Sequence, residues 1–417
     1  MSRCKRLLQQ SDKMRSRVDS AATDARQCSA FLLPSDPHMH IVADENIPLL
    51  QAFFADQGRL TTLPGRSIRR EHLLDADALL VRSVTRVDPA LLEGTPVQFV
   101  GTCTIGTDHL DLPGLATAGI TVASAPGCNA RGVVEYVLSC LLTLSERTGL
   151  PWRERRVGIV GVGEVGSRLA ATLGALGVEC VLCDPPRAAR GEAGFVELDA
   201  LLAQVDVVSC HVPLTRNGPD ATWHLLDAPR LMALQHGTWL INSSRGPVID
   251  NHALSVLLAE RPDVQVALDV WELEPQVDTA LLKLCALGTP HIAGYSLDGK
   301  LRGTEQIYQA WCRHRGEQPR LTLQALAPEA GCAQLQFSAE TPAQWMLEKA
   351  LRQVYDVRDD DARFRAMMMP LAGQSTGAAF DALRKDYPLR RECPQVRILH
   401  ADGEGQAALM AAAGFNV

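Results

Sequence analysis

The sequence predicts an α/β protein with two doubly wound parallel-sheet domains and a smaller α+β domain at its C-terminal end. Three observations lead to this prediction. The chain has 417 residues, which is too long for one ordinary hydrophobic core. From Met39 onward, short β-type runs alternate with segments of helical periodicity, as in parallel sheets covered by helices. This alternation ends near Pro319, and a region of mixed pattern follows.

The first alternating block predicts a sheet of short strands. The strands are expected at Ile41–Ala43, Ala78–Val81, Phe99–Gly101 and Thr121–Ser124. Between them, Leu49–Gln57, Arg70–Leu74 and Asp88–Leu92 have the pattern of helices or helical turns. Asn129 is placed to cap a long helix from Ala130 to about Arg147, which Gly149 and Pro151 would end.

The second block has the same rhythm. Its predicted strands are Arg156–Val160, Glu179–Cys183, Val205–His211, Thr238–Asn242 and Val264–Asp269, and its helices are Gly166–Leu176, Leu198–Gln204, Pro229–Leu234 and Asn251–Glu260. A short strand and a helix within Thr289–Gly316 could return the chain to the first domain. In the third region we expect a helix at Gln344–Asp356 and a strand at Val396–His400.

These blocks define the expected domains. Residues 39–138 and 289–320 form a substrate and catalytic domain, residues 139–288 a nucleotide-binding domain, and residues 321–417 a C-terminal domain. Residues 1–38 are polar and lack the apolar stretch of a secretory signal, so we expect a disordered extension or a start codon assigned too far upstream. A transit peptide is the alternative for this segment, because its arginines outnumber its acids.

Composition narrows the classes of function. The net charge of −7 provides no basic field for nucleic acid, and no apolar run is long enough to span a membrane. The twelve cysteines lie scattered in apolar segments, which predicts reduced, buried thiols in a cytoplasmic protein. Cys180 and Cys183 form a single CxxC inside a strand pattern, so we interpret it as core and predict no metal site.

The strongest local signal is a glycine-rich turn between a strand and a helix. Gly161-Val-Gly163-Glu164-Val165-Gly166 follows the predicted strand Arg156–Val160 and opens an apolar helix. In this context Gly161 allows a tight turn, Gly163 lets backbone approach a pyrophosphate, and Gly166 permits close helix–strand packing. The free amides at the helix start would face the phosphates. The sequence therefore predicts a Rossmann-type dinucleotide site.

The identity of the dinucleotide depends on the end of the next strand. Asp184 stands there, at roughly the twenty-residue spacing expected for a ribose-binding acid. Its carboxylate would accept hydrogen bonds from both ribose hydroxyls and repel a 2′-phosphate, which favours NAD over NADP. Arg187 lies close in sequence and could accommodate such a phosphate, so it stands against this prediction.

Three downstream residues have complementary chemistry for oxidising a 2-hydroxy acid. His291 could take the hydroxyl proton, Arg245 could hold the carboxylate, and Glu274 could orient the imidazole. Arg245 and Glu274 follow predicted strands, at the strand ends where open α/β sheets bind ligands, and His291 lies in Thr289-Pro-His-Ile-Ala-Gly294. Each residue alone has an ordinary structural explanation, and it is their set that indicates catalysis.

Taken in order, GxGxxG, Asn242-Ser-Ser-Arg-Gly246, Asp269-Val-Trp-Glu-x-Glu-Pro275 and Thr289-Pro-His-Ile-Ala-Gly294 resemble the D-isomer-specific 2-hydroxyacid dehydrogenase family. The resemblance implies that Arg245, Glu274 and His291 form the active site. It also implies an NAD contact surface made of the fingerprint residues Gly161, Gly163, Glu164, Val165 and Gly166, together with Asp184, His211, Val212, Ser243, Ser244, Arg245, Asp269 and Gly294. The serine pair before Arg245 departs from the pairs common in this family.

Further segments resemble one branch of that family, which acts on a phosphorylated four-carbon acid. They include Val42-Ala-Asp-Glu-Asn46, Val81-Arg-Ser-Val-Thr85, Ala125-Pro-Gly-Cys-Asn-Ala130, Val354-Tyr-Asp-Val-Arg358 and Leu383-Arg-Lys-Asp-Tyr387. The resemblance implies NAD-dependent oxidation of 4-phospho-D-erythronate on the route to pyridoxal 5′-phosphate, and a homodimer formed through the C-terminal domain. Ser83, Thr104 and Tyr295 match its substrate-contacting positions, and Arg82 offers a charge for the phosphate.

Two alternatives stay open. A 3-phosphoglycerate dehydrogenase would use the same chemistry on a shorter acid, although its longer forms carry a tail of alternating strands that this sequence lacks. A dinucleotide-sensing binding protein on the same fold could retain the same triad, and the fold alone does not settle function.

For the tail, we expect the helix Gln344–Asp356 to pair with a second copy and one or more tail arginines to reach the substrate phosphate. The arginines considered are Arg358, Arg363, Arg365, Arg384, Arg390 and Arg391.

Overall fold

A computed structural model describes residues 39–399 and 404–417 of the chain. The expectations for residues 1–38, and for His400 at the end of a predicted strand, lie outside these residues. The described chain divides into two compact units, which are treated separately below. One contains residues 39–129 and Leu297–Glu329, and the other contains Ala130–Ser296 and Ala330–Val417.

The first unit is built on a five-stranded parallel sheet with the order β2-β1-β3-β4-β5. Its strands are β1 His40–Asp44, β2 Arg59–Leu63, β3 Ala78–Val81, β4 Phe99–Thr102 and β5 Thr121–Ala123. Its helices are α2 Leu50–Phe54, α3 Pro89–Leu92, α4 Leu112–Thr117, α12 Leu297–His314 and α13 Leu323–Leu326, with 3₁₀ turns η2 Gly65–Ser67 and η3 Arg70–Leu73. The strand order reverses between β1 and β3, which is the switch point where such sheets bind ligands.

Two separate apolar clusters cover the faces of this sheet. Ile41 and Leu80 pack with α2 and with Ile307 and Trp311 of α12, so the helix expected within Thr289–Gly316 packs in this unit, whereas no strand lies within that range. Val42 and Leu79 point to the other face. The sequence did not predict β2, because this strand pairs only with β1 and none of its residues is buried.

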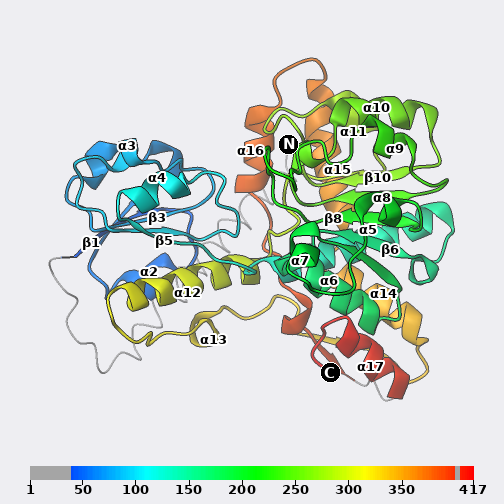
Figure 1. The fold of residues 1–417 in the computed structure, drawn as a ribbon. Helices are drawn as coiled ribbons and strands as arrows, with labels where there is room; N and C mark the ends of the chain where they lie inside the picture. The colour runs from blue at the N-terminus through cyan, green and yellow to red at the C-terminus, as the bar shows by residue number, and fades with distance from the viewer. Residues whose placement is uncertain (1–38, 400–403) are drawn as a thin grey trace. The chain divides into compact units, whose positions relative to one another are not determined.

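The second unit contains a six-stranded parallel sheet with the order β11-β10-β9-β8-β6-β7. The strands are β6 Val157–Val160, β7 Cys180–Cys183, β8 Val207–Cys210, β9 Trp239–Asn242, β10 Gln265–Leu268 and β11 Leu287–Gly288. The helices are α5 Ala130–Thr148, α6 Glu164–Ala175, α7 Pro185–Ala189, α8 Leu198–Leu202, α9 Ala228–Met232, α10 Asn251–Glu260 and α11 Thr279–Leu284, with 3₁₀ turns η4 Trp152–Glu154 and η5 Gly246–Val248 (Figure 1). Successive residues such as Val207 and Val208 face opposite clusters, so helices cover both faces and the sheet is doubly wound.

The C-terminal region adds mostly helices and one small parallel pair of strands. The strands are β12 Gln334–Gln336 and β13 Arg397–Leu399. The helices are α14 Ala343–Val354, α15 Val357–Met368, α16 Gly377–Lys385 and α17 Glu404–Ala412, with 3₁₀ turns η6 Met369–Leu371 and η7 Cys393–Gln395. The predicted α+β character of this region is therefore present.

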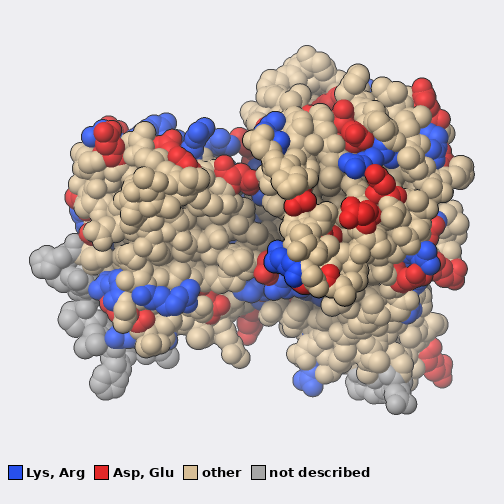
Figure 2. All heavy atoms as spheres, viewed as in Figure 1, with Lys and Arg blue, Asp and Glu red and all other residues tan. Residues whose placement is uncertain are grey.

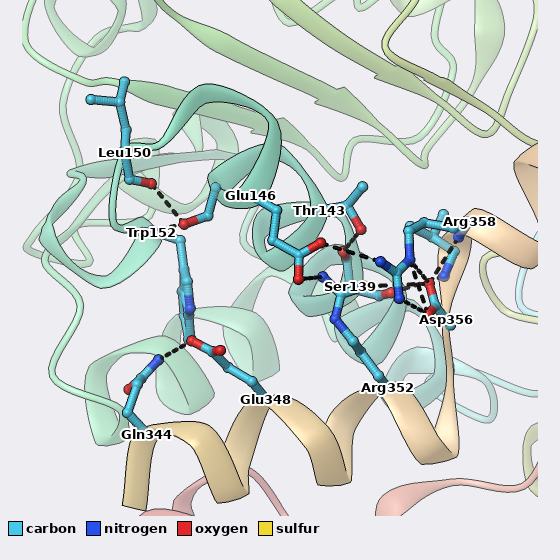
Figure 3. Close-up of polar contacts among 12 residues, drawn as sticks. Ser139, Thr143, Glu146, Leu150, Trp152, Gln344, Glu348, Arg352, Asp356 and Arg358 are labelled. Carbon is cyan, nitrogen blue, oxygen red and sulfur yellow. Dashed lines mark hydrogen bonds and ion pairs between the residues drawn. The ribbon is translucent and has the colours of Figure 1, made fainter. Parts of the chain in front are cut away.

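This region completes both cores of the second unit. Met346 and Leu347 of α14 pack in the cluster that contains α5 and α6, while Phe364 of α15 and Phe380 of α16 pack in the opposite cluster. Polar contacts reinforce this packing at α5, where Glu146 forms an ion pair with Arg352 at 2.8 Å and accepts a hydrogen bond from Arg358 at 3.2 Å (Figure 3). The expectation that α14 buries its apolar face against a second copy is wrong, because α5 and α17 of the same chain cover that face.

Surface charge, helix hydropathy and the CxxC pair are further features of the described residues. In the view of Figure 2, acidic and basic side chains are interspersed over the visible face. Among the described residues, no helix is both long enough and apolar enough to cross a membrane. Cys180 and Cys183 lie on β7 as free thiols, and burial raises the pKa of each to about 11.

Candidate active site

Three neighbouring strands bring the predicted catalytic residues to one edge of the second sheet. Because β9, β10 and β11 are adjacent and parallel, their C-terminal ends meet at the same edge. Arg245 follows β9, Glu274 follows β10 and His291 follows β11. The order of strands thus gathers side chains that are separated in the sequence.

A short contact joins two of these residues. His291 Nδ1 lies 2.7 Å from Glu274 Oε2, and the other carboxylate oxygen of Glu274 accepts a hydrogen bond of 2.7 Å from the Trp271 amide. Glu274 is therefore held from its own loop while it engages the imidazole. If Nδ1 carries the proton, Nε2 is the atom free to accept a proton from a substrate hydroxyl.

Opposing influences set the charge of Glu274. Burial raises the pKa of its carboxyl, but the neighbouring His291, the Trp271 amide and the charge of Arg384 outweigh burial. The net pKa of Glu274 lies below its ordinary value. The carboxylate is consequently ionised at neutral pH, which is the form that stabilises a protonated imidazole.

Asp269 shapes the segment that carries His291. Its two carboxylate oxygens accept hydrogen bonds from Thr289 Oγ1 and the Ile292 amide, each at 2.7 Å, and from the Ala293 amide at 2.9 Å. Its backbone carbonyl accepts from the His291 amide, and His291 itself adopts a positive φ of 56°. Burial raises the pKa of the Asp269 carboxyl. These bonds hold His291 in a backbone conformation that non-glycine residues rarely adopt.

The loop with Arg245 lies directly against the loop with Glu274. A Cβ atom on Gly246 would stand 2.0 Å from the carbonyl of Trp271, so only glycine allows this approach. The side chain of Asn242 donates to the Arg245 carbonyl at 3.0 Å and accepts from Ser244 Oγ at 2.8 Å. These hydrogen bonds hold the backbone of the turn between β9 and η5, from which the Arg245 side chain extends.

The three glycines of the fingerprint have different surroundings. Gly161 has a φ of 87°, and a Cβ there would stand 2.7 Å from Val212 Cγ1 and 2.8 Å from the His211 carbonyl. A Cβ on Gly166 would stand 2.0 Å from the Gly161 carbonyl oxygen. A Cβ on Gly163 would meet nothing within 4 Å, so this glycine borders open space at the start of α6. The sheet order reverses between β6 and β8 at this point.

Asp184, for which the sequence predicts a ribose-binding role, directly follows β7. Asp184 Oδ2 accepts from the Val162 amide at 2.8 Å, and Oδ1 caps α7 by accepting from the Arg187 amide at 3.0 Å. The Arg187 guanidinium is held by Glu192 at 2.7 Å and donates to the Val162 carbonyl at 2.8 Å. Because its charge is matched by Glu192, Arg187 is poorly placed to neutralise a 2′-phosphate.

Other predicted cofactor contacts lie on the same sheet edge with varied surroundings. Ser243 Oγ is buried and has no hydrogen-bond partner among the described residues, so the site contains a polar atom suited to a ligand. Burial lowers the pKa of His211 to about 4, and its Nε2 lies 2.9 Å from Ser209 Oγ. Glu164 pairs with Arg168 at 2.5 Å, and Val165 packs partly against the core. The open space at Gly163 and the unpartnered Ser243 hydroxyl fit a dinucleotide.

The predicted substrate residues of the first unit share a sheet edge of their own. Arg82 and Ser83 follow β3, and Thr104 follows the neighbouring parallel strand β4. Thr104 Oγ1 lies 2.7 Å from Thr102 Oγ1 and donates to the Gly106 carbonyl at 3.0 Å. Ser83 is exposed and Arg82 partly exposed.

Residues of the C-terminal region contact the loops that carry Glu274 and His291, and the sequence did not predict most of these contacts. Asp361 accepts from the Gly288 amide at 2.8 Å, and the buried Arg390 donates to the Ala293 carbonyl at 3.2 Å. Thr376 Oγ1 accepts from the Val277 amide at 2.7 Å. The guanidinium carbon of Arg384 lies 5.3 Å from the centre of the Tyr295 ring. The only sign of these contacts in the sequence is the cluster of acids and arginines after Pro319. Which residues these side chains contact depends on the fold and could not be predicted from that cluster.

Comparison with known proteins agrees with this geometry. Residues 142–293 match the family model for the "D-isomer specific 2-hydroxyacid dehydrogenase, NAD binding domain", which defines the chain as a dehydrogenase of that class. The sequence is 54% identical to an erythronate-4-phosphate dehydrogenase of Pseudomonas fluorescens, over 90% of this chain and 99% of that protein. It is 57% identical to the one of Pseudomonas aeruginosa, over 89% and 97%. The chain belongs to the erythronate-4-phosphate dehydrogenase family.

Two further comparisons concern the fold and the tail. A D-lactate dehydrogenase from Aquifex aeolicus, solved with NAD and lactic acid, has a TM-score of 0.55 at 24% identity, with 67% of this chain and 96% of that chain covered. A 3-phosphoglycerate dehydrogenase of Entamoeba histolytica with bound NAD⁺ has a TM-score of 0.57 at 22% identity, covering 66% and 95%. These two show the fold alone. Residues 326–414 match a family model described only as a domain of unknown function.

Proposed function

We propose that the chain oxidises 4-phospho-D-erythronate to 3-hydroxy-2-oxo-4-phosphobutanoate with NAD, a step toward pyridoxal 5′-phosphate. The observation that carries the proposal is the 2.7 Å contact between His291 and Glu274 at the sheet edge that also holds the dinucleotide fingerprint. The choice of 4-phospho-D-erythronate as the substrate rests on membership of the family.

His291, Glu274 and Arg245 have different roles in the proposed reaction. His291 takes the proton from the substrate hydroxyl, and Glu274 orients the imidazole and stabilises the charge it acquires. Arg245 holds the substrate carboxylate and opposes negative charge on the reacting oxygen. NAD, when bound, would be held by Gly161, Gly163, Gly166 and Asp184 and would supply the hydride acceptor.

Further positions define the cofactor and substrate surfaces. The family resemblance assigns Glu164, Val165, His211, Val212, Ser243, Ser244, Asp269 and Gly294 to the NAD surface, and it assigns Arg82, Ser83, Thr104 and Tyr295 to the substrate. Asp184 makes NAD the preferred dinucleotide, because the nearby Arg187 is already matched by Glu192. The protein works in the cytoplasm as a homodimer, with residues 321–417 as the dimerisation domain. The interface must lie outside the apolar face of α14.

A substrate panel tests the proposal. Purified full-length protein would be supplied with NAD or NADP and with 4-phosphoerythronate, erythronate or 3-phosphoglycerate, and NADH or NADPH absorbance would be followed. We expect NAD-dependent turnover that is fastest with 4-phosphoerythronate. Faster turnover of 3-phosphoglycerate would point to the shorter acid, and cofactor binding without turnover of any acid would point to a dinucleotide sensor.

A further inference from the structure

The C-terminal region brings one cation to the proposed active site from within the same chain. Arg384, near the end of α16, lies with its guanidinium carbon 5.3 Å from the Tyr295 ring centre and 5.7 Å from that of Phe380. Its charge also reaches Glu274, whose pKa it helps to lower. Arg384 therefore lies near both a proposed catalytic residue and a proposed substrate contact.

The position of α16 is fixed at its other end by the loop that follows Glu274. The Thr376 amide donates to Gln276 Oε1 at 3.0 Å, and the Val277 amide donates to Thr376 Oγ1 at 2.7 Å. A Cβ on Gly377 would stand 2.8 Å from the side-chain Nε2 of Gln276, so the helix begins in close contact with this loop. Phe380 is fully buried and packs against Phe364. These contacts make α16 a rigid support for Arg384.

Among the six tail arginines considered above, Arg384 has no carboxylate within ion-pair distance in residues 39–399 and 404–417 and no hydrogen-bond partner on its buried Nε. The others are already engaged: Arg358 with Asp356, Arg363 with Asp360, Arg365 with Asp361, and Arg390 with the carbonyls of Ala293 and Gly132. Arg391 also has partners of its own. A partly buried guanidinium without an acid is suited to an anionic ligand.

We propose that Arg384 binds the phosphate of the substrate beside Tyr295, so that the region of unknown function supplies a specificity-determining residue of the active site. The proposal rests on the proposed function. The substrate carries two anionic groups, and Arg245, in the turn after β9, is assigned to the carboxylate next to the reacting carbon. The phosphate lies at the far end of the substrate and needs a separate cation. A guanidinium matches phosphate oxygens in pairs and binds them with charge-assisted hydrogen bonds.

The test compares variants of one helix. Arg384→Gln removes the charge, Arg384→Lys keeps it without the planar fork, and Lys385→Gln removes an equal charge from the exposed neighbouring residue. We expect Arg384→Gln to raise KM for 4-phosphoerythronate about 10- to 100-fold, with a smaller rise for Arg384→Lys. KM for erythronate, which lacks the phosphate, should stay unchanged, as should both constants in Lys385→Gln. Thermal unfolding would establish that all variants are folded.

A second measurement does not depend on turnover. Calorimetric titration of the full-length protein with inorganic phosphate should show affinity at least about tenfold weaker in Arg384→Gln than in wild type. If wild type failed to oxidise 4-phosphoerythronate but this difference held, the proposed function would fail and the anion site would stand. Unchanged KM and phosphate affinity in Arg384→Gln would overturn the inference. A fall in kcat alone would also overturn it, because Arg384 would then act through Glu274.

Discussion

His291 Nδ1 lies 2.7 Å from Glu274 Oε2, and the backbone places this pair from two directions. The Trp271 amide holds Glu274, while the carboxylate of Asp269 binds the amides that follow His291. The geometry of the pair is thus set by β10 and β11 together rather than by the two side chains alone.

Substitution of either member should lower turnover without loss of cofactor binding. We expect His291→Gln to lower kcat by a factor on the order of 10² to 10⁴, the range typical of general acid–base catalysis. Glu274→Gln should lower it by roughly tenfold or more, because the amide cannot balance the charge on the imidazole. Steady-state kinetics and NAD titration would measure both. Wild-type turnover in His291→Gln would remove this residue from the mechanism.

Two glycines of the fingerprint should respond in opposite ways to alanine. In Gly166→Ala the new Cβ would stand 2.0 Å from the Gly161 carbonyl oxygen, so the free energy of unfolding should fall by about 2 kcal/mol or more. In Gly163→Ala the Cβ meets no protein atom within 4 Å, so stability should change by less than about 1 kcal/mol. Its methyl group would instead occupy the path of the pyrophosphate and raise Kd for NAD by about tenfold or more.

Denaturant unfolding and NAD titration of the two variants distinguish these effects. A stable Gly166→Ala protein would show that α6 can move away from β6 at little cost. Unchanged NAD affinity in Gly163→Ala would show that the dinucleotide does not pass this glycine.

The apolar pattern of the sequence predicted most strands of the six-stranded sheet and the bounds of one helix. The helix Asn251–Glu260 has the predicted bounds, and every strand of the six-stranded sheet except the two-residue β11 was assigned within about two residues. These segments have strong apolar patterns, because a parallel sheet is buried on both faces. The exposed edge strand β2 lacks that pattern and was missed.

The candidate site could be predicted only as far as its motifs extend. Arg245, Glu274 and His291 stand in recognisable segments, and the sheet order explains why they meet. Arg384 and Arg390 stand in no such segment, and their partners Tyr295 and Ala293 are remote in sequence. The engagement of Arg187 by Glu192 likewise depends on side-chain geometry that spacing cannot supply.

Acid should weaken the fold partly through His211. Burial lowers the pKa of this imidazole to about 4, whereas an exposed histidine in the unfolded chain titrates near 6.5. Between these values the unfolded chain binds a proton that the folded chain does not, so the free energy of unfolding falls as pH falls from about 6.5 to about 4. The loss from this residue is at most roughly 3 kcal/mol, and it is absent above pH 7.

Denaturant unfolding at several pH values would measure this effect. His211→Gln should lose less stability than wild type between neutral pH and about pH 4.5. His252→Gln is the control, because that side chain is exposed and forms no ion pair with the described residues, so the variant should follow the pH profile of wild type. Identical pH profiles for wild type and His211→Gln would mean that the folded protein accommodates the protonated ring.

Removal of residues 330–417 should prevent folding of the second unit rather than simply yield a monomer. Met346, Leu347, Phe364 and Phe380 are each fully buried in clusters shared with the six-stranded sheet and its helices. Their removal would expose apolar surface on both faces of that sheet, at roughly 1.5–3 kcal/mol for each large side chain, against a typical total stability of about 5–15 kcal/mol. The truncated protein should be aggregated or lack a cooperative unfolding transition.

Leu389→Ala is the control for this prediction, because it alters a side chain that is 53% exposed and should leave the transition unchanged. A truncated protein that unfolded cooperatively and bound NAD would show that the sheet needs no cover from the tail. Because truncation is expected to remove the fold itself, the roles of the tail in dimerisation and substrate binding have to be measured with single substitutions such as Arg384→Gln.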